Sequence, residues 1–286
     1  MSKATSSPLV LYTVADAIAT ITLNDPERLN PIGHGPGSME ERLLAALIKA
    51  DQDPAVHCIV VSAAGTAFSS GGDFGSAVNC DKAIDHLWFL ENTDGVNEQI
   101  RSLRKPTLGA INGLCYGAGF MLAMHLDLLV AAEDARFGLI ETRFGATGCE
   151  VLPLLIGAQW AKFLTLTGEV ISAKRAKAIG LVLDVVPKSE LEARVHALAR
   201  RIACMPIEAL ILNKRALNAA LTNAGWMAQK QTGRAINALT LAHMRTAVGA
   251  PGIPFMEILR QQGWAAFKQA RDEPFANPWL QDPEDS

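Results

Sequence analysis

Short apolar runs rich in β-branched residues recur through the first two thirds of the chain, and turn or helix signals follow each of them. Between these runs, apolar residues return every three or four positions, which is typical of amphipathic helices. The pattern therefore predicts strands that alternate with helices, in an α/β fold. The predicted strands are Ile18–Leu23, Cys58–Ser62, Thr107–Ile111, Leu126–Ala131 and Leu181–Val186.

Serine and glycine mark the predicted helix ends. Ser38 and Glu41 have the spacing of a capping box, in which the hydroxyl accepts a backbone N–H and the carboxylate reaches back. The segment Ser189–Glu192 has the same spacing and predicts a second helix start. A further helix is expected to begin at Ser172 and to close at Gly180.

The pattern changes after Met205 and Pro206. Helical periodicity then continues to Arg271 without strand-like alternation, interrupted by a glycine- and proline-rich cluster at residues 249–254. We therefore predict two regions: residues 1–205, in which strands and helices alternate, and residues 206–286, which are helical.

Composition excludes several classes of function. Of the 286 residues, 49% are hydrophobic and 19% are charged, which supports an ordered core. The net charge of −3 argues against a nucleic-acid or polybasic membrane partner. Five scattered cysteines without a C-x-x-C spacing indicate free thiols in a reducing compartment, and no metal site. No signal peptide is visible, and no apolar stretch reaches the roughly 20 residues that span a bilayer, so we expect a cytoplasmic protein.

Two glycine-rich segments are candidates for binding an anion through the backbone. Ala67–Phe74 carries two consecutive glycines after a predicted strand, and Asn112–Gly119 leads from a strand into a helix. Exposed N–H groups in such turns suit an anion or an oxyanion. The alternatives are a tight turn in the first segment and close helix packing in the second.

A third segment, Ala135–Gly145, contains Glu141 among apolar neighbours. Burial in such surroundings raises a carboxyl pKa toward the range that is useful for general acid–base catalysis. The alternative is a salt bridge between this carboxylate and Arg143 or Arg136. Two N–H donors can hold a thioester oxygen as it becomes an enolate oxygen. The carboxylate can then move protons at the carbon beside that carbonyl.

Seven motifs follow one another along the chain: Asn24-Asp-Pro-Glu-Arg-Leu-Asn30, Phe68-Ser-Ser-Gly-Gly-Asp73, Ile111-Asn-Gly-Leu-Cys-Tyr-Gly-Ala-Gly119, Ala135-Arg-Phe-Gly138, Leu166-Thr-Gly168, Ala178-Ile-Gly-Leu-Val182 and Gly263-Trp-Ala-Ala-Phe-Lys268. In this order they resemble the crotonase superfamily (the enoyl-CoA hydratase/isomerase family) over roughly residues 10–275. The resemblance implies a spiral of repeated β-β-α units in residues 1–205 that carries an acyl-CoA site. It also implies a helical oligomerisation region in residues 206–286, a homotrimer or dimer of trimers, and no cofactor apart from the coenzyme A of the substrate.

The resemblance assigns the two oxyanion donors to the backbone N–H groups of Gly72 and Ala118, and a catalytic carboxylate to Glu141. Met121 occupies the position of the other glutamate that hydratases of the family use. A thioether cannot transfer a proton, so we do not expect full hydratase activity, whereas one carboxylate suffices for double-bond isomerisation. Glu150 stands where a neutral residue is usual and is either a replacement acid or a surface residue.

Further residues match family positions that contact the substrate. Those expected along the acyl or pantetheine path are Asp73, Phe74 and Met121, those near the nucleotide are Arg28 and Leu29, and those in the C-terminal segment are Phe267 and Lys268.

The leading interpretation is an enoyl-CoA hydratase/isomerase homologue that acts through a thioester enolate, with proton transfer by Glu141. One alternative is a carbon–carbon hydrolase of the same superfamily that cleaves a β-dicarbonyl substrate, with His34 or Glu150 recruited. Another is a catalytically impaired acyl-CoA binder.

Overall fold

The computed structural model describes residues 8–73, 82–248 and 252–282, and no side chains of residues 92–95 and 245. In this part of the chain, six strands form a central sheet in the order β1-β2-β3-β5-β7-β10. Only β1 and β2 pair in antiparallel fashion; the other neighbours in this sheet are parallel. The bounds are β1 Val10–Ala15, β2 Ile18–Leu23, β3 Cys58–Ala63, β5 Thr107–Ile111, β7 Leu128–Ala132 and β10 Asp184–Val186.

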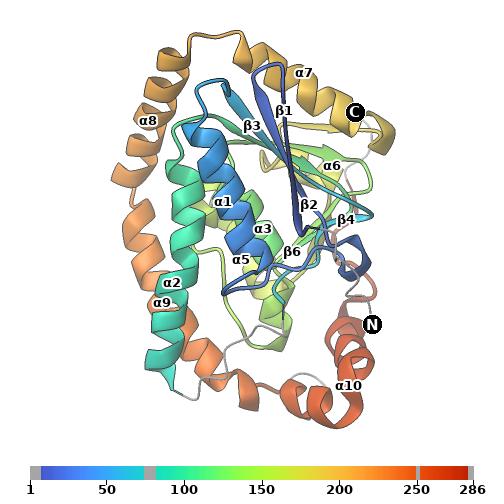
Figure 1. Ribbon diagram of the computed structural model, residues 1–286. Coiled ribbons are helices and arrows are strands. Elements are labelled where there is room, and N and C mark those ends of the chain that lie inside the picture. Colours follow the sequence, from blue (N-terminus) through green and yellow to red (C-terminus); the bar gives the residue numbers. More distant parts are fainter. Residues whose placement is uncertain (1–7, 74–81, 249–251, 283–286) are drawn as a thin grey trace, which may run out of the picture.

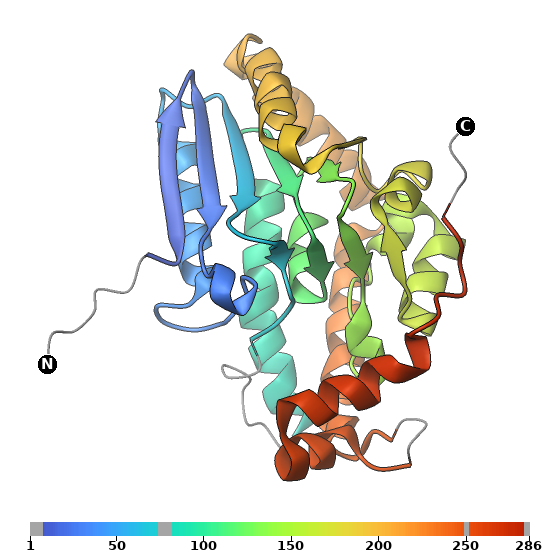
Figure 2. The same cartoon turned by 90° about the vertical axis from the view of Figure 1, so that its right-hand side faces the viewer.

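A smaller sheet has the order β4-β6-β8-β9 and lies beside the first (Figure 2). Its strands are β4 Ala67–Ser69, β6 Leu114–Tyr116, β8 Arg136–Gly138 and β9 Val170–Ser172. Each of β3, β5 and β7 is followed by a strand of the smaller sheet and then by a helix or helical turn. This is the predicted spiral of β-β-α units.

Helices cover both faces of the central sheet, which explains why its inner strands carry mostly apolar side chains on both faces. Ile59 and Val61 of β3 pack into the main core with residues of α1 and α3, whereas Val60 faces the opposite core with Val195 of α7. The helices of residues 8–205 are α1 Met39–Gln52, α2 Ala83–Ser102, α3 Ala118–Ala123, α4 Leu152–Ile156, α5 Ala158–Thr167, α6 Ala173–Ala178 and α7 Leu191–Ala203.

Two of the three predicted helix starts are confirmed. The hydroxyl of Ser38 accepts the Glu41 N–H at 3.2 Å, and the Glu41 carboxylate accepts the N–H of Gly37. Ser172 caps α6 in the same way. The helix predicted after Ser189 forms as α7, but the capping box is wrong, because Lys188–Glu190 forms a 3-10 turn and α7 begins after it without a side-chain cap.

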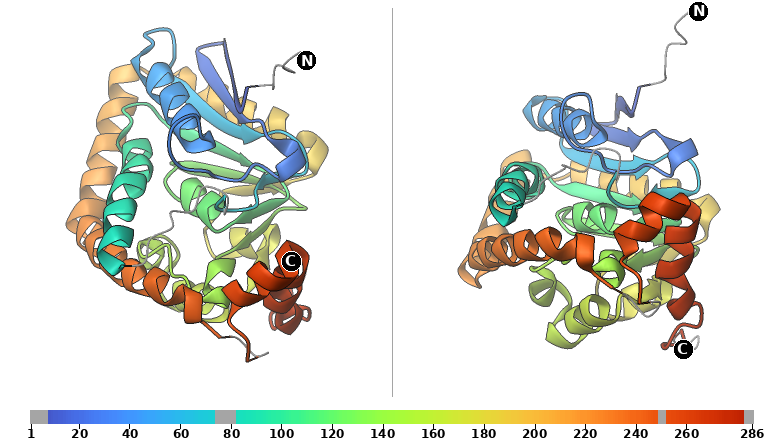
Figure 3. Two further views of the ribbon diagram at one scale, coloured as in Figure 1. Left: turned by 60° about the horizontal axis from the view of Figure 1, so that its bottom comes forward. Right: turned by 90° about the horizontal axis from the view of Figure 1, so that it is seen from below.

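The helices after residue 205 are α8 Ile207–Asn223, α9 Trp226–His243 and α10 Phe255–Asp272. α9 runs beside α2 (Figures 1 and 3), where the Trp226 indole donates to Glu98 at 2.8 Å. α10 is kinked at Gly263, whose φ of 85° and ψ of −178° are not helical. The oligomerisation role of this region stays a prediction.

Candidate active site

The three segments singled out in the sequence leave the same edge of the smaller sheet. β4, β6 and β8 are parallel neighbours, with Ser69 opposite Cys115 and Tyr116 opposite Gly138. Because the carboxyl ends of parallel strands meet at one edge, the loops after them are brought together. A methyl group built on Gly71 would lie 3.3 Å from the Tyr116 carbonyl oxygen, so the first two loops are in close contact.

The N–H groups of Gly72 and Ala118 have no hydrogen-bond acceptor within the described residues. A short β-bridge joins Ile32 to the first loop: the Ile32 N–H donates to the Gly71 carbonyl, and the Asp73 N–H donates to the Ile32 carbonyl. The Gly72 N–H takes no part in this bridge. Ala118 is the first residue of α3, where N–H groups have no intrahelical acceptor. Both predicted oxyanion donors are therefore available to a ligand.

Glu141 lies in the 3-10 turn η3 (Ile140–Phe144), and both of its carboxylate oxygens are buried. Neither oxygen has a hydrogen-bond partner within the described residues. Burial raises the pKa of Glu141 to about 7, and the nearby N–H of its own backbone and the attraction of Arg271 oppose only part of this effect. Its Oε2 lies 3.2 Å from where a methyl group on Gly117 would sit, which places the carboxylate beside the second donor loop.

The predicted alternative for Glu141, a salt bridge, is excluded. The Arg143 guanidinium pairs with Asp272 at 2.9 Å, and the Arg136 guanidinium donates to the carbonyl of Ala135 at 2.9 Å. Arg143 is therefore paired with another carboxylate and Arg136 is hydrogen-bonded to a backbone carbonyl. Neither lowers the raised pKa of the Glu141 carboxyl by pairing with it.

Met121 lies three residues after the second donor on α3. A methyl group on Gly148 would lie 2.0 Å from the Met121 methyl and 3.0 Å from Oε1 of Glu141. The thioether and the Glu141 carboxylate therefore approach the same small residue. The assignment of Met121 to the position of a second family glutamate stays a prediction.

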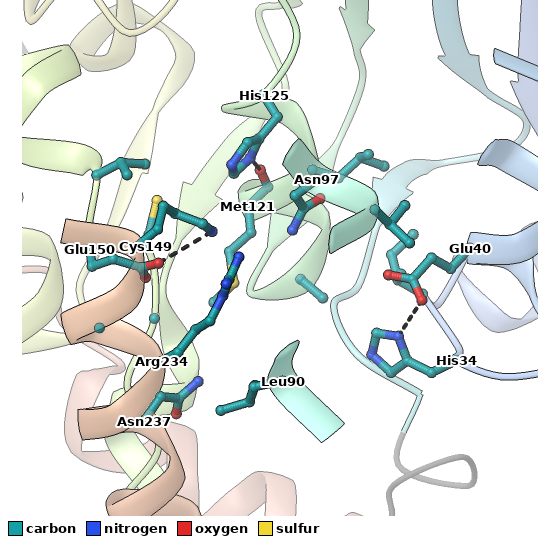
Figure 4. A pocket seen from close by; sticks show the side chains of 18 of the residues that line it. His34, Glu40, Leu90, Asn97, Met121, His125, Cys149, Glu150, Arg234 and Asn237 are labelled. Atoms are coloured by element: carbon teal, nitrogen blue, oxygen red, sulfur yellow. Dashed lines mark hydrogen bonds and ion pairs between the residues drawn. The ribbon is translucent and has the colours of Figure 1, made fainter. Parts of the chain in front are cut away.

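A cavity of about 120 Å³ extends from Ala118 and Met121 to α9. On one side, His34 Nδ1 lies 2.6 Å from Oε2 of Glu40 (Figure 4). The His34 imidazole meets the Phe89 ring edge-on. The remaining lining residues include Asn97 and Leu90 of α2, Cys149 and Glu150 of the loop before α4, and Lys230, Arg234 and Asn237 of α9.

Glu150 lies in the wall of this cavity, with its carboxylate 3.2 Å from the Lys230 ammonium. The Glu150 side chain is 23% exposed, so it is neither fully buried nor fully at the surface, and its role as a replacement acid stays a prediction. Sequence analysis missed Lys230, Arg234 and Asn237; their spacing on one helix, around Gly233, was the available signal.

The residues predicted to contact the nucleotide and pantetheine lie in different settings. Arg28 pairs with Asp73 at 2.8 Å, so two predicted substrate contacts meet at one place. Leu29 adopts a left-handed conformation next to Arg28, and Lys268 is exposed. Phe74 lies outside the described residues. Their contacts with substrate stay predictions.

The prediction for Phe267 is corrected. This side chain is fully buried and packs against Phe144 and Phe255 in a core that fixes α10 to η3. A ring enclosed in this way cannot lie along a ligand; it instead helps to hold the turn that carries Glu141.

The buried carboxyl predicts a pH-dependent stability difference. A raised pKa favours the protonated folded state, so the contribution of Glu141 is fully present below pH 4.5 and is lost as pH rises through about 7. We expect the stability of Glu141→Gln relative to the wild-type protein to increase by about 3 kcal/mol between these limits. Urea unfolding at several pH values measures it. The exposed Glu27→Gln serves as control, and a pH-independent difference would contradict the assignment.

Comparison with known proteins agrees with the geometry. The two-sheet spiral is the crotonase fold, which solved enoyl-CoA hydratases share. The sequence model of the enoyl-CoA hydratase/isomerase family matches residues 13–250, and the chain belongs to this family.

Individual relatives cover most of the chain. The 1,2-epoxyphenylacetyl-CoA isomerase of Escherichia coli K12 is 30% identical over 75% of this chain and 83% of its own. A crystal structure of an enoyl-CoA hydratase/isomerase from Xanthobacter autotrophicus Py2 is 32% identical with a TM-score of 0.84, covering 94% of this chain and 99% of its own. An enoyl-CoA hydratase from Mycobacterium smegmatis has the same TM-score at 28% identity, covering 94% of each chain.

The described residues contain neither a membrane-spanning helix nor a group of side chains that could bind a metal ion. None of their helices has the length and apolarity that crossing a membrane requires. Their histidine, cysteine, aspartate and glutamate side chains form no group of three that could hold a metal ion.

Proposed function

We propose that this protein moves a proton between carbons of an acyl-CoA thioester, with Glu141 as the acid–base group. The observation that carries the proposal is the buried Glu141 carboxylate, which has no hydrogen-bond partner within the described residues. It lies beside the loop that leads into α3, where the Ala118 N–H has no acceptor within the described residues. A carboxyl with a pKa of about 7 is ionised enough to take a proton and acidic enough to return it near neutral pH.

In the proposed mechanism, the N–H groups of Gly72 and Ala118 donate to the thioester oxygen. Removal of a proton from carbon by Glu141 leaves an electron pair that delocalises onto this oxygen, and the two donors stabilise the enolate. The same carboxyl then returns the proton to a different carbon of the conjugated system. The double bond shifts and no atom is gained or lost.

Met121 supports isomerisation over hydration. Addition of water needs one group to activate the water and another to deliver a proton to carbon, and Met121 cannot do either. Two pairs of ionisable groups line the cavity near Met121, His34 with Glu40 and Glu150 with Lys230. Glu141 is therefore the group best suited to carry the proton.

A second candidate function is hydrolysis of a carbon–carbon bond in a β-dicarbonyl substrate. The observation that favours it is the pair formed by His34 and Glu40 in the cavity wall, since a carboxylate on Nδ1 orients an imidazole for proton transfer at Nε2. In that reaction the pair would activate water and the same two N–H donors would hold the enolate that leaves.

The proposal extends to partners and location. We infer an acyl-CoA substrate without a separate cofactor, handled by a homotrimer or dimer of trimers in the cytoplasm. Exposed apolar side chains such as Leu212 and Leu217 on α8 support contact with another subunit, and the free thiols of Cys58, Cys115 and Cys204 support a reducing compartment.

Incubation of CoA esters in deuterated water tests the reaction directly. We expect β,γ-unsaturated esters to become α,β-unsaturated with deuterium incorporated at carbon, and hydrated products to form much more slowly. Mass spectrometry of the products measures both. A chain-shortened acid from a β-keto ester would instead establish the hydrolase. Absence of deuterium uptake with intact ester binding would identify an acyl-CoA binder and overturn the proposal.

A further inference from the structure

One wall of the cavity is formed by one face of α9, a helix that lies far from the oxyanion loops in the sequence. Lys230, Gly233, Arg234 and Asn237 all line the cavity, and their spacing of three and four residues places them on one side of a helix. Figure 4 shows Arg234 projecting from α9 toward Met121, with Asn237 on the same helix on the side of Leu90. This polar wall is defined as Glu150, Lys230, Arg234 and Asn237.

The packing of the polar wall is specific. Lys230 is only 3% exposed and lies 3.2 Å from the Glu150 carboxylate. The stem of Glu150 lies directly on Gly233, because a methyl group there would be 2.4 Å from its Cγ. A larger residue at position 233 would expel the carboxylate. The chain therefore has a glycine where the charged pair needs space.

A plain alkyl chain is a poor match for this wall. Removing water from charged groups without supplying a new hydrogen bond costs free energy, so an apolar acyl tail against them would bind weakly. An oxygen atom in the tail would replace that water. The Lys230 ammonium and the Arg234 guanidinium are hydrogen-bond donors, so the wall contains groups that suit an oxygen acceptor.

We propose that the acyl group of the substrate carries an oxygen-bearing substituent, a hydroxyl, carbonyl or carboxylate, at the end away from the thioester, and that the polar wall binds it. Ala118 and the polar wall line the same cavity, so one acyl group can reach from the oxyanion donor to α9. The inference rests on the proposed acyl-CoA function and specifies its substrate class.

The competing explanation is that Glu150 and Lys230 only clamp the loop before α4 onto α9. The two explanations predict different results when both charges are removed together. Replacement of a purely structural buried pair by neutral residues is often without cost to stability, and it would leave substrate preference unchanged. Loss of a binding wall changes the preference.

The test uses six-carbon CoA esters of equal length: the unsubstituted ester, its ω-hydroxy derivative and its ω-carboxy derivative. Unsaturated forms report kcat and KM, and saturated forms report the dissociation constant without any reaction. We expect the wild-type protein to prefer at least one oxygenated ester by about tenfold or more, since one recovered hydrogen bond to a charged group is worth that factor. The arms show which oxygen function is favoured.

The double variant Glu150→Gln/Lys230→Met is expected to abolish the preference, mainly through KM and the dissociation constant. Asp134→Asn/Lys188→Met, which removes an exposed ion pair elsewhere, is the matched control and is expected to retain it. Arg234→Met gives a second reading should the double variant not fold.

The inference would be overturned if the wild-type protein preferred the unsubstituted ester. It would also be overturned if the double variant preferred oxygenated esters as strongly as the wild-type protein does. These outcomes are distinct from failure of the proposed function. If the unsubstituted ester isomerises while oxygenated esters are rejected, only the inference fails. If the saturated oxygenated esters bind selectively but no ester exchanges its protons, the proposed proton transfer fails and the binding wall stands.

Discussion

Glu141→Gln is expected to lower kcat for double-bond isomerisation by about a thousandfold, because the amide cannot take up a proton from carbon. The dissociation constant of the CoA ester should change only a few-fold. Glutamine has nearly the same shape, and the thioester oxygen is proposed to be held by backbone N–H groups that the substitution does not alter. The effect should therefore appear in kcat and not in KM.

The measurement is steady-state kinetics combined with calorimetric binding of a saturated ester. Glu169→Gln is a matched control, since Glu169 is also buried but its carboxylate contacts the Trp279 N–H outside the cavity. Unchanged turnover in Glu141→Gln would remove Glu141 from the mechanism. Equal losses in both variants would indicate a general effect of removing a buried carboxylate.

The pH profile provides a further reading of the same group. Removal of a proton from carbon requires the ionised carboxylate, so kcat/KM for the free enzyme should rise with pH through about 7. The residual kcat/KM of Glu141→Gln should not show this rise with pH.

Gly113→Ala is expected to lower the free energy of unfolding by at least about 4 kcal/mol. Gly113 connects β5 to β6 with a φ of 52°, and a methyl group there would lie 1.8 Å from the Thr66 carbonyl oxygen. The obstacle is backbone and not a flexible side chain, so a strand must move. The Gly113 carbonyl also accepts the Arg136 N–H at 2.8 Å, which couples β6 to β8.

Urea unfolding measures this loss. Gly225→Ala is the matched control, because Gly225 also has a positive φ, 105°, but nothing lies within 4 Å of an added methyl group. We expect the control to lose about 1 kcal/mol from backbone strain alone. Similar losses in the two variants would show that strain, and not the clash with Thr66, sets the cost.

Long apolar elements were predictable because periodicity needs several residues to be visible. β2 and β5 have the predicted bounds, whereas β7 begins two residues later than predicted, at Leu128. The predicted residue Leu126 instead donates its N–H to Ala123 at the end of α3. β4, β6 and β8, with three residues each, are too short for a pattern, yet they bring the site loops together.

Local chemistry was also predictable. Glu141 is surrounded by apolar residues in the sequence, and the turn that contains it keeps those neighbours close. Gly72 and Ala118 were assigned by resemblance, and backbone donors do not depend on which side chain is present. These assignments need only a few consecutive residues, so the chain itself carries them.

By itself, the sequence determined the family, the main strands and the apolar setting of the acid–base candidate. Only the tertiary structure decided which charges find partners. Lys230 meets Glu150 across 80 positions of sequence, His34 meets Glu40, and Phe267 is enclosed in a core. Pairing and burial depend on distances between segments that the fold brings together, and these distances set both the pKa of a buried carboxyl and the polarity of a cavity.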